Sequence, residues 1–219
     1  MNSKSTLFTA LALATALWAK PASAAVVMLD FEGVAPSAGN GPTYLNSHGI
    51  ALTNLTPSGP SGVVDIYNYS GSGSLWANND FLQQNGAGAV PCSYTLNFSI
   101  PLTSIGFERV ATPPNLATEP QWSATAYVGA VPVGTVGESL NTWGNSPAHS
   151  FTLTGSGKTS LTVNANGFGF TAIGSVPLDN FVLTQVPEPS ITTLGLISLG
   201  LVAMRKKFRR AEQGTFRFI

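Results

Sequence analysis

The chain has 219 residues, and its ten lysines and arginines balance its ten aspartates and glutamates, so its formal net charge is zero. This balance hides an uneven distribution, because residues 25–185 hold eight acidic and only two basic side chains, a net charge of −6. Such a region lacks the clustered Lys and Arg that neutralise phosphates, so we expect no nucleic acid partner. The single cysteine, Cys92, excludes an intramolecular disulfide. We interpret Cys92 as a small buried residue and not a catalytic thiol, because no histidine is close to it in sequence.

The first 24 residues have the pattern of a secretory signal peptide. Lys4 supplies a positive region, Leu7–Ala19 is apolar, and Ala22-Ser23-Ala24 is a small-residue cleavage site. We therefore expect Sec export and removal of residues 1–24 by signal peptidase. The alternative, a first transmembrane helix, requires a longer apolar stretch.

Residues 25–185 are long enough for one domain with a core, and their pattern is all-β. Tyr94–Ile100 alternates apolar and polar residues most clearly, and Trp122 begins an apolar face that predicts a core position for its ring. No amphipathic helix is evident; residues 37–42 are interpreted as loop and residues 78–91 as irregular surface. The other strands are expected at residues 25–31, 63–69, 103–110, 122–128, 133–136, 150–153, 160–164, 168–173 and 181–184. Short strands punctuated by Gly, Pro, Asn and Ser predict a single β-sandwich, with a jelly roll as the favoured form and a barrel as the alternative.

The stretch from Val186 to Arg210 has three parts in a fixed order. Pro187-Glu188-Pro189 is a rigid, extended linker, and the uncharged run Ile191–Met204 follows it. As a helix, Ser190–Met204 would measure about 22 Å against a hydrocarbon core of about 30 Å, which is short for a permanent anchor and favours a transient one. Bases stay on the cytoplasmic side, so residues 25–185 should lie outside. The basic cluster consists of Arg205, Lys206, Lys207, Arg209 and Arg210.

The triplet, the short apolar run and the bases together closely resemble the PEP-CTERM sorting signal of Gram-negative bacteria. The resemblance implies recognition and processing near Val186, Pro187, Glu188 and Pro189 by an exosortase, a membrane-embedded cysteine transpeptidase. It also implies passage through the inner membrane to the outer surface or the extracellular matrix. This sequence departs from the family in continuing through residues 211–219, whereas family tails usually stop soon after the bases.

A second resemblance concerns the exported domain. The segments YTLNFSIPLTSIGFERV, GFGFTAIG and PLDNFVLTQ look like ectodomains common among PEP-CTERM proteins, which are similar in pattern to jelly-roll carbohydrate-binding modules. In sandwiches of this kind the first and last strands lie close together, and carboxylates there often hold a structural calcium ion. Asp30, Glu32 and Asp179 are the candidate ligands. The alternative is a solvated strand edge in which Asp179 or Asn180 caps a turn.

Aromatic side chains are the candidates for ligand binding, because sugar rings stack their C–H faces on such rings. Tyr67 and Tyr69 share a strand face with Asp65, whereas Trp76 follows a flexible loop and Trp143 lies in a polar one. The alternative for the two tyrosines is half-buried packing on the sheet. No zinc, serine-nucleophile or phosphate-loop motif is present, and His48 and His149 are isolated in polar loops.

The sequence thus predicts an exported surface or matrix protein whose domain is a binding or structural module for extracellular polysaccharide. The alternative is a secreted hydrolase of such a polymer, for which Asp30 and Glu32 offer a carboxylate pair. No catalytic motif supports this alternative, so we expect no enzyme activity.

Overall fold

The structure is a computed structural model, and two compact units account for its internal contacts. One unit spans Ala25–Val186; the other comprises Met1–Ala24 and Pro187–Ile219. The residues that the structure describes are 23–34, 39–56, 64–67, 81–84, 91–110, 121–138, 147–165 and 176–187. Residues 1–22 and 188–219, with most of the predicted signal peptide and sorting signal, lie outside the described ranges.

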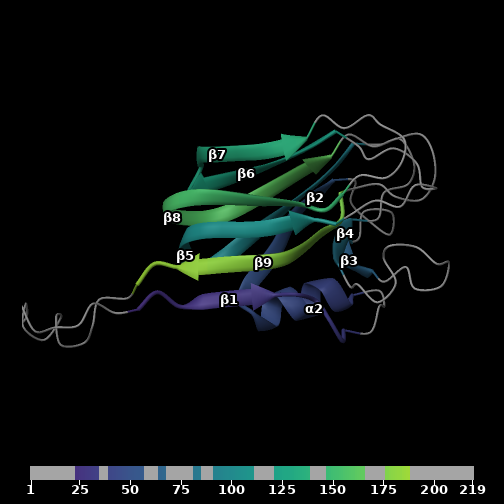
Figure 1. The fold of residues 1–219 in the computed structure, drawn as a ribbon, viewed down its shortest axis with the longest axis horizontal. Coiled ribbons are helices and arrows are strands. Elements are labelled where there is room, and N and C mark those ends of the chain that lie inside the picture. Colours follow the sequence, from purple (N-terminus) through teal and green to yellow (C-terminus); the bar gives the residue numbers. More distant parts are fainter. Residues whose placement is uncertain are drawn as a thin grey trace, which may run out of the picture. The chain divides into compact units, whose positions relative to one another are not determined.

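The unit Ala25–Val186 is mostly antiparallel β-sheet, as the sequence predicts (Figure 1). The strands pair in the order β3-β4-β9-β5-β8-β6-β7, with β1 also paired to β9 and β2 to β5. In the described part of the chain the elements are β1 (Val26–Leu29), α2 (Asn40–Ser47), β2 (Ile50–Thr56), β3 (Val64–Tyr67), β4 (Phe81–Gln84), β5 (Cys92–Arg109), β6 (Trp122–Val128), β7 (Val131–Glu138), β8 (His149–Ala165) and β9 (Leu178–Gln185).

Two long strands, β5 and β8, form an antiparallel ribbon that folds back on itself. Trp122 pairs with Ala165 at one end of β8, yet its ring centroid lies 5.1 Å from that of Phe151 near the other end. A straight strand would separate Phe151 from Ala165 by about 46 Å. The ribbon bends near residues 98–103 and 155–159, where the β5–β8 register shifts. The two halves of the ribbon therefore face each other, as in a sandwich.

Each half of the ribbon belongs to one layer of the sandwich. The first half of β5 and the second half of β8 lie with β2, β6 and β7, and we call this layer A. The second half of β5 and the first half of β8 lie with β9, which pairs with β1 and β4; this is layer B. The buried core includes Tyr94, Leu96, Phe107, Trp122 and Phe181. Trp122 and Cys92 are buried, as predicted.

The bend in the ribbon gives the unit two different ends, visible in Figure 1. At the bend end, defined by residues 98–103 and 155–159, Gln185 donates its backbone N–H to the carbonyl of Ala25 at 2.8 Å. Val186 donates to the carbonyl of Pro101 at 2.9 Å. Both ends of the unit therefore emerge there. At the opposite end, the loop end, lie both termini of β5 and β8, the start of β9 and the end of β7.

Several predicted boundaries are wrong. Pro101 does not end a strand, because β5 runs through it with register shifts between Asn97 and Ser104. The strands expected at residues 150–153 and 160–164 are both parts of β8. Phe81–Gln84, within a stretch interpreted as irregular surface, is strand β4, which is set by pairing with β3 and β9 and not by a local pattern.

Helix α2 was not expected either, and it covers part of the predicted loop at residues 37–42. Its N-terminus has no local cap; instead the Asp65 carboxylate of β3 accepts the N–H groups of Gly39 at 2.7 Å and Gly41 at 2.6 Å. Asp65 is itself buried. A Cβ at Gly41 would lie 2.7 Å from the Asp65 Cα, so this approach requires glycine. A distant carboxylate thus satisfies the orphan donors of a short helix.

Asp65→Asn should destabilise the unit by about 1–3 kcal/mol, because charge-assisted hydrogen bonds to buried N–H groups are weakened. Urea unfolding followed by circular dichroism measures the free energy of unfolding. The matched control is Asp30→Asn, at an exposed carboxylate whose contact with the Glu32 N–H is 3.3 Å long. Equal free energies of unfolding for the two variants would contradict the capping role of Asp65.

Candidate functional site

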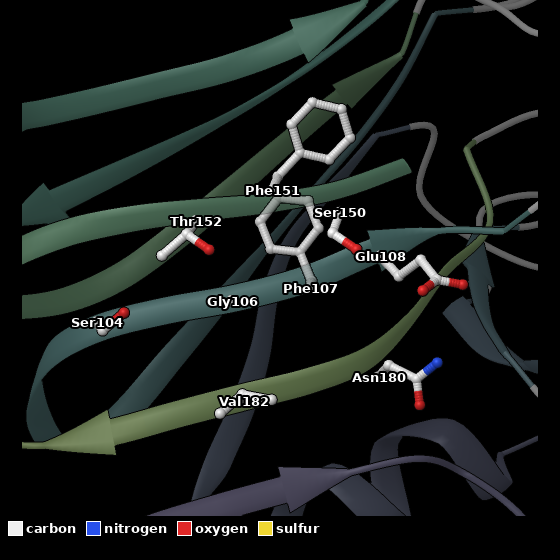
Figure 2. Close-up of a pocket in the computed structure, with 9 residues that line it drawn as sticks. All are labelled: Ser104, Gly106, Phe107, Glu108, Ser150, Phe151, Thr152, Asn180 and Val182. Atoms are coloured by element: carbon white, nitrogen blue, oxygen red, sulfur yellow. The ribbon is translucent and has the colours of Figure 1, made fainter. Parts of the chain in front are cut away.

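A groove of about 290 Å³ lies on the sheet of layer B, across strands β5, β8 and β9 (Figure 2). Figure 2 shows Glu108, Ser150 and Asn180 toward one end and Ser104 toward the other. The lining residues come from strand segments far apart in the chain: Ser104, Gly106, Phe107, Glu108, Ser150, Phe151, Thr152, Asn180 and Val182.

Register explains why these residues meet. Gly106 of β5 is opposite Thr152 of β8 on one side and Val182 of β9 on the other. Glu108 is opposite Ser150. Side chains alternate between the two faces of a strand, so Phe107 is buried whereas Glu108 reaches the outer face. The hollow thus follows from the pairing of three strands.

Gly106 lines the middle of the groove and contributes no side chain to it. A Cβ there would lie 3.6 Å from the Val182 Cβ, an ordinary van der Waals contact, and the backbone has no positive φ. Neither crowding nor backbone geometry therefore requires glycine at this position. Its effect is to leave open the space that a side chain would fill.

The lining combines polar groups with an apolar base. Ser104, Ser150 and Thr152 offer hydroxyls, and Asn180 offers an amide. Asn180 has a φ of 50°, and its backbone N–H donates to the Asp179 carboxylate at 2.6 Å, which fixes the start of β9 beside the groove. Donors, acceptors and apolar surface in one open groove suit a polyhydroxylated ligand.

One end of the groove adjoins a partly buried polar cluster centred on Glu138. The Glu138 carboxylate accepts from Arg109 Nε at 2.5 Å and Trp122 Nε1 at 3.0 Å, and lies 2.7 Å from His149 Nδ1. Arg109 also donates to the carbonyls of Val110 and Pro147. Since the Arg109–His149 pair follows Glu108–Ser150 in register, this cluster holds β5, β6, β7 and β8 together beside the groove.

The donors decide the charge state of Glu138. Burial by itself would raise the pKa of its carboxyl and is the largest single influence. Hydrogen bonds from Arg109, His149 and Trp122 outweigh it, so the pKa lies below its ordinary value. Glu138 is therefore an ionised carboxylate at neutral pH, and its fully used oxygens mark a structural role.

The three predicted calcium ligands differ in their surroundings. Asp30 and Glu32 are exposed, whereas Asp179 is buried. Burial and the charge of Asp30, with a smaller effect of Asp179, raise the pKa of Tyr44, which places both carboxylates near its phenol. Within the described ranges, no group of three or more His, Cys, Asp or Glu side chains could hold a metal ion. The calcium site stays a prediction.

The predicted aromatic ligand-binding residues fall largely outside the description. Tyr67 ends β3, but its side chain is not described, and Tyr69, Trp76 and Trp143 lie in segments outside the described ranges. Val186 and Pro187 are described, whereas Glu188, Pro189 and the basic cluster are not. Among the described helices none is both long and apolar enough to cross a bilayer.

No sequence pattern predicted the groove. Thr103–Glu108 and Ser150–Thr152 alternate apolar residues with small or polar ones, and that alternation was the available signal. The alternation does not predict that Gly106, Thr152 and Val182 lie side by side, because the register between two distant strands cannot be deduced from the sequence of either strand alone.

Comparisons with known proteins give only distant likenesses. No protein-family model matches the chain, and no curated protein matches it. Among solved structures, the K1 cleaved adhesin domain of Lys-gingipain from Porphyromonas gingivalis W83 is 12% identical, with a TM-score of 0.46, over 74% of this chain and 99% of that one. A CBM27-1 from Caldicellulosiruptor saccharolyticus, solved with mannohexaose, is 12% identical, with a TM-score of 0.42, over 76% and 99%. Likenesses of this size assign no ligand to the chain.

Glu138→Gln should lower the free energy of unfolding at neutral pH by about 3 kcal/mol, because the buried Arg109 loses its counter-ion. The folded-state pKa of Glu138 is lowered, so its contribution is complete above the unfolded-state pKa and is lost as the pH falls through the folded-state pKa. Urea unfolding between about pH 7 and about pH 3 should therefore show a shallower acid loss in Glu138→Gln than in the parent protein. The control is Glu32→Gln at an exposed site; an acid loss in Glu138→Gln as steep as in the parent would refute the role.

Proposed function

We propose that the protein is an exported surface or matrix protein whose domain, residues 25–186, binds extracellular polysaccharide in the groove of layer B. The observation that carries the proposal is the open groove itself, in which hydroxyls, an amide and a carboxylate surround the hollow at Gly106. Such a surface can read the hydroxyls of a sugar while Val182 and the base of the groove contact its C–H groups. The jelly-roll form of the sandwich belongs to the same proposal.

The groove favours a neutral polymer. Glu108 is the only charged side chain among the lining residues, and a carboxylate repels uronate or sulfate groups. The presence of a single carboxylate among the lining residues also weakens the hydrolase alternative, because most glycosidases need two carboxyl groups flanking the scissile bond. Asp30 and Glu32 do not line this groove.

The export route completes the proposal. The PEP-CTERM resemblance supports recognition of Val186, Pro187, Glu188 and Pro189 by an exosortase after Sec export and signal peptide removal. A transient membrane anchor would then deliver the domain to the outer surface. Val186 is hydrogen bonded to Pro101 and so belongs to the folded unit, which supports processing on the C-terminal side of this residue.

Gly106→Leu should reduce polysaccharide binding about tenfold or more, because the new side chain occupies the groove. Its Cβ meets only ordinary contacts, so the fold should persist. Glycan-array binding followed by calorimetry on the best neutral glycan measures the effect. Ser93→Leu, which adds the same side chain to a half-buried position in layer A, is the matched control. Unchanged affinity of Gly106→Leu would remove the groove from the proposal, and turnover of any glycan would favour the hydrolase.

The sorting proposal predicts that protein isolated from the cell surface lacks Arg205–Ile219. Intact-mass spectrometry of the surface fraction measures this directly. Replacing Pro187 and Pro189 by Ala should make the unprocessed chain accumulate in the inner membrane, since the extended triplet is lost. Surface protein that retains residues 205–219 would contradict tail removal, whatever the outcome of the glycan experiments.

A further inference from the structure

The turn between β6 and β7 exposes an uninterrupted apolar sequence. All six residues from Val128 to Val133 are exposed, and none carries a charge or a polar side chain. The exposed fraction is 39% for Val128, 61% for Val131 and 46% for Val133. Exposed apolar residues scattered singly are ordinary, but a run of this length on one turn indicates a surface that meets another apolar phase. We call Val128–Val133 the hairpin tip.

The hairpin tip is held in place and is not a frayed strand end. Gly129 turns the chain with a φ of 58°, and its N–H donates to the Thr159 hydroxyl of β8 at 2.9 Å. Strand pairs flank the turn closely, with Val128 opposite Val131 and Tyr127 opposite Ser160. The valines are therefore displayed at a fixed position on the domain.

That position is the bend end, where the chain leaves the unit. Thr159 and Ser160 adjoin the fold of the ribbon, and Ala25, Gln185 and Val186 are hydrogen bonded there. Val26, exposed at 55%, begins β1 at the same end. The apolar run Ile191–Met204 starts four residues after Pro187, so a membrane holding that run lies within about 15 Å of this end.

Charge is distributed so that the bend end avoids the desolvation cost of a membrane surface. Lys158 is fully buried there, and its ammonium donates to the carbonyls of Thr103 and Gly155. Among the described residues, the carboxylates lie toward the loop end of the unit: Asp30, Glu32, Asp65, Glu108, Glu138 and Asp179.

We propose that the hairpin tip inserts into the lipid surface of the membrane to which the tail is anchored, so that the domain stands on its bend end. The inference rests on the proposed sorting signal for its tether, not on the polysaccharide site. Three valines alone bind a bilayer weakly, but a tether gives the tip a high effective concentration at the surface. Until the tail is processed, the tether and the hairpin tip together supply the two signals that stable attachment requires.

The test separates the hairpin tip from the tail. Residues 25–187 form a unit with its own core, and an oligohistidine tag after Pro187 attaches them by the bend end to phosphatidylcholine vesicles that contain a nickel-chelating lipid. Ala130→Cys carries an environment-sensitive fluorophore, while buried Cys92 is not labelled. The matched control is Asn164→Cys, an exposed site near the loop end. The full chain in vesicles without the nickel lipid is measured in parallel.

The expected result is a shift of the Ala130→Cys emission to shorter wavelength on vesicles, with quenching by lipid-borne quenchers, and no shift at Asn164→Cys. Adding Val131→Asp and Val133→Asp should abolish the shift. An unchanged emission on tethered vesicles overturns the proposal. So does a shift without vesicles that grows with protein concentration, because the occupant is then a second copy. A shift with the tag but no vesicle association of the full chain also overturns the proposal, because the tip can then insert but the tail does not hold it at a membrane; this result assigns the failure to the sorting signal and not to the hairpin tip.

Discussion

The sharp fold of the β5–β8 ribbon is the constraint on which the rest of the unit depends. It brings Phe151 against Trp122 and so closes the core between the two layers. It also encloses a buried cation, because the ammonium of Lys158 donates to the carbonyls of Thr103 and Gly155 at the bend. Burial lowers the pKa of this lysine, and backbone carbonyls at the register shifts stabilise its charge. A ladder interrupted by bulges thus supplies acceptors that a regular ladder would have used internally.

The same fold separates two kinds of surface. Tight turns and the points of chain exit lie at the bend, whereas the polar cluster around Glu138 joins the strand ends at the other extremity. The groove lies on the flank of layer B, between these ends. If the hairpin tip rests on lipid, the groove opens sideways and is not covered by the membrane. Polysaccharide binding and membrane contact then use different faces of one small domain.

Local patterns predicted which strand residues face the core, but they did not predict how the strands and the helix are connected. Alternation correctly placed Tyr94, Leu96 and Trp122 in the core, because the period of a half-buried strand is visible within a few residues. Helix α2 was not predicted because its cap, Asp65, comes from another element and its sequence begins with Asn-Gly-Pro. The continuity of β5 through Pro101 was not predicted, because proline has no N–H to donate to a strand ladder. In the structure only its carbonyl is needed, since it accepts a hydrogen bond from the N–H of Val186. Contacts between segments distant in sequence determined both of these outcomes.

The position of β9 has a mechanical consequence. This strand leads directly to the C-terminal tail and lies between β5 on one side and β1 and β4 on the other. A pull on the tail acts along the strand, so the hydrogen bonds to Ser104, Ile105 and Gly106 of β5 and to β1 are loaded together in shear and do not open one after another. Resistance to such a pull depends on the rate of forced unfolding and not on equilibrium stability. A domain held at the cell surface by this end would keep its shape under a force that pulls it away from its anchor.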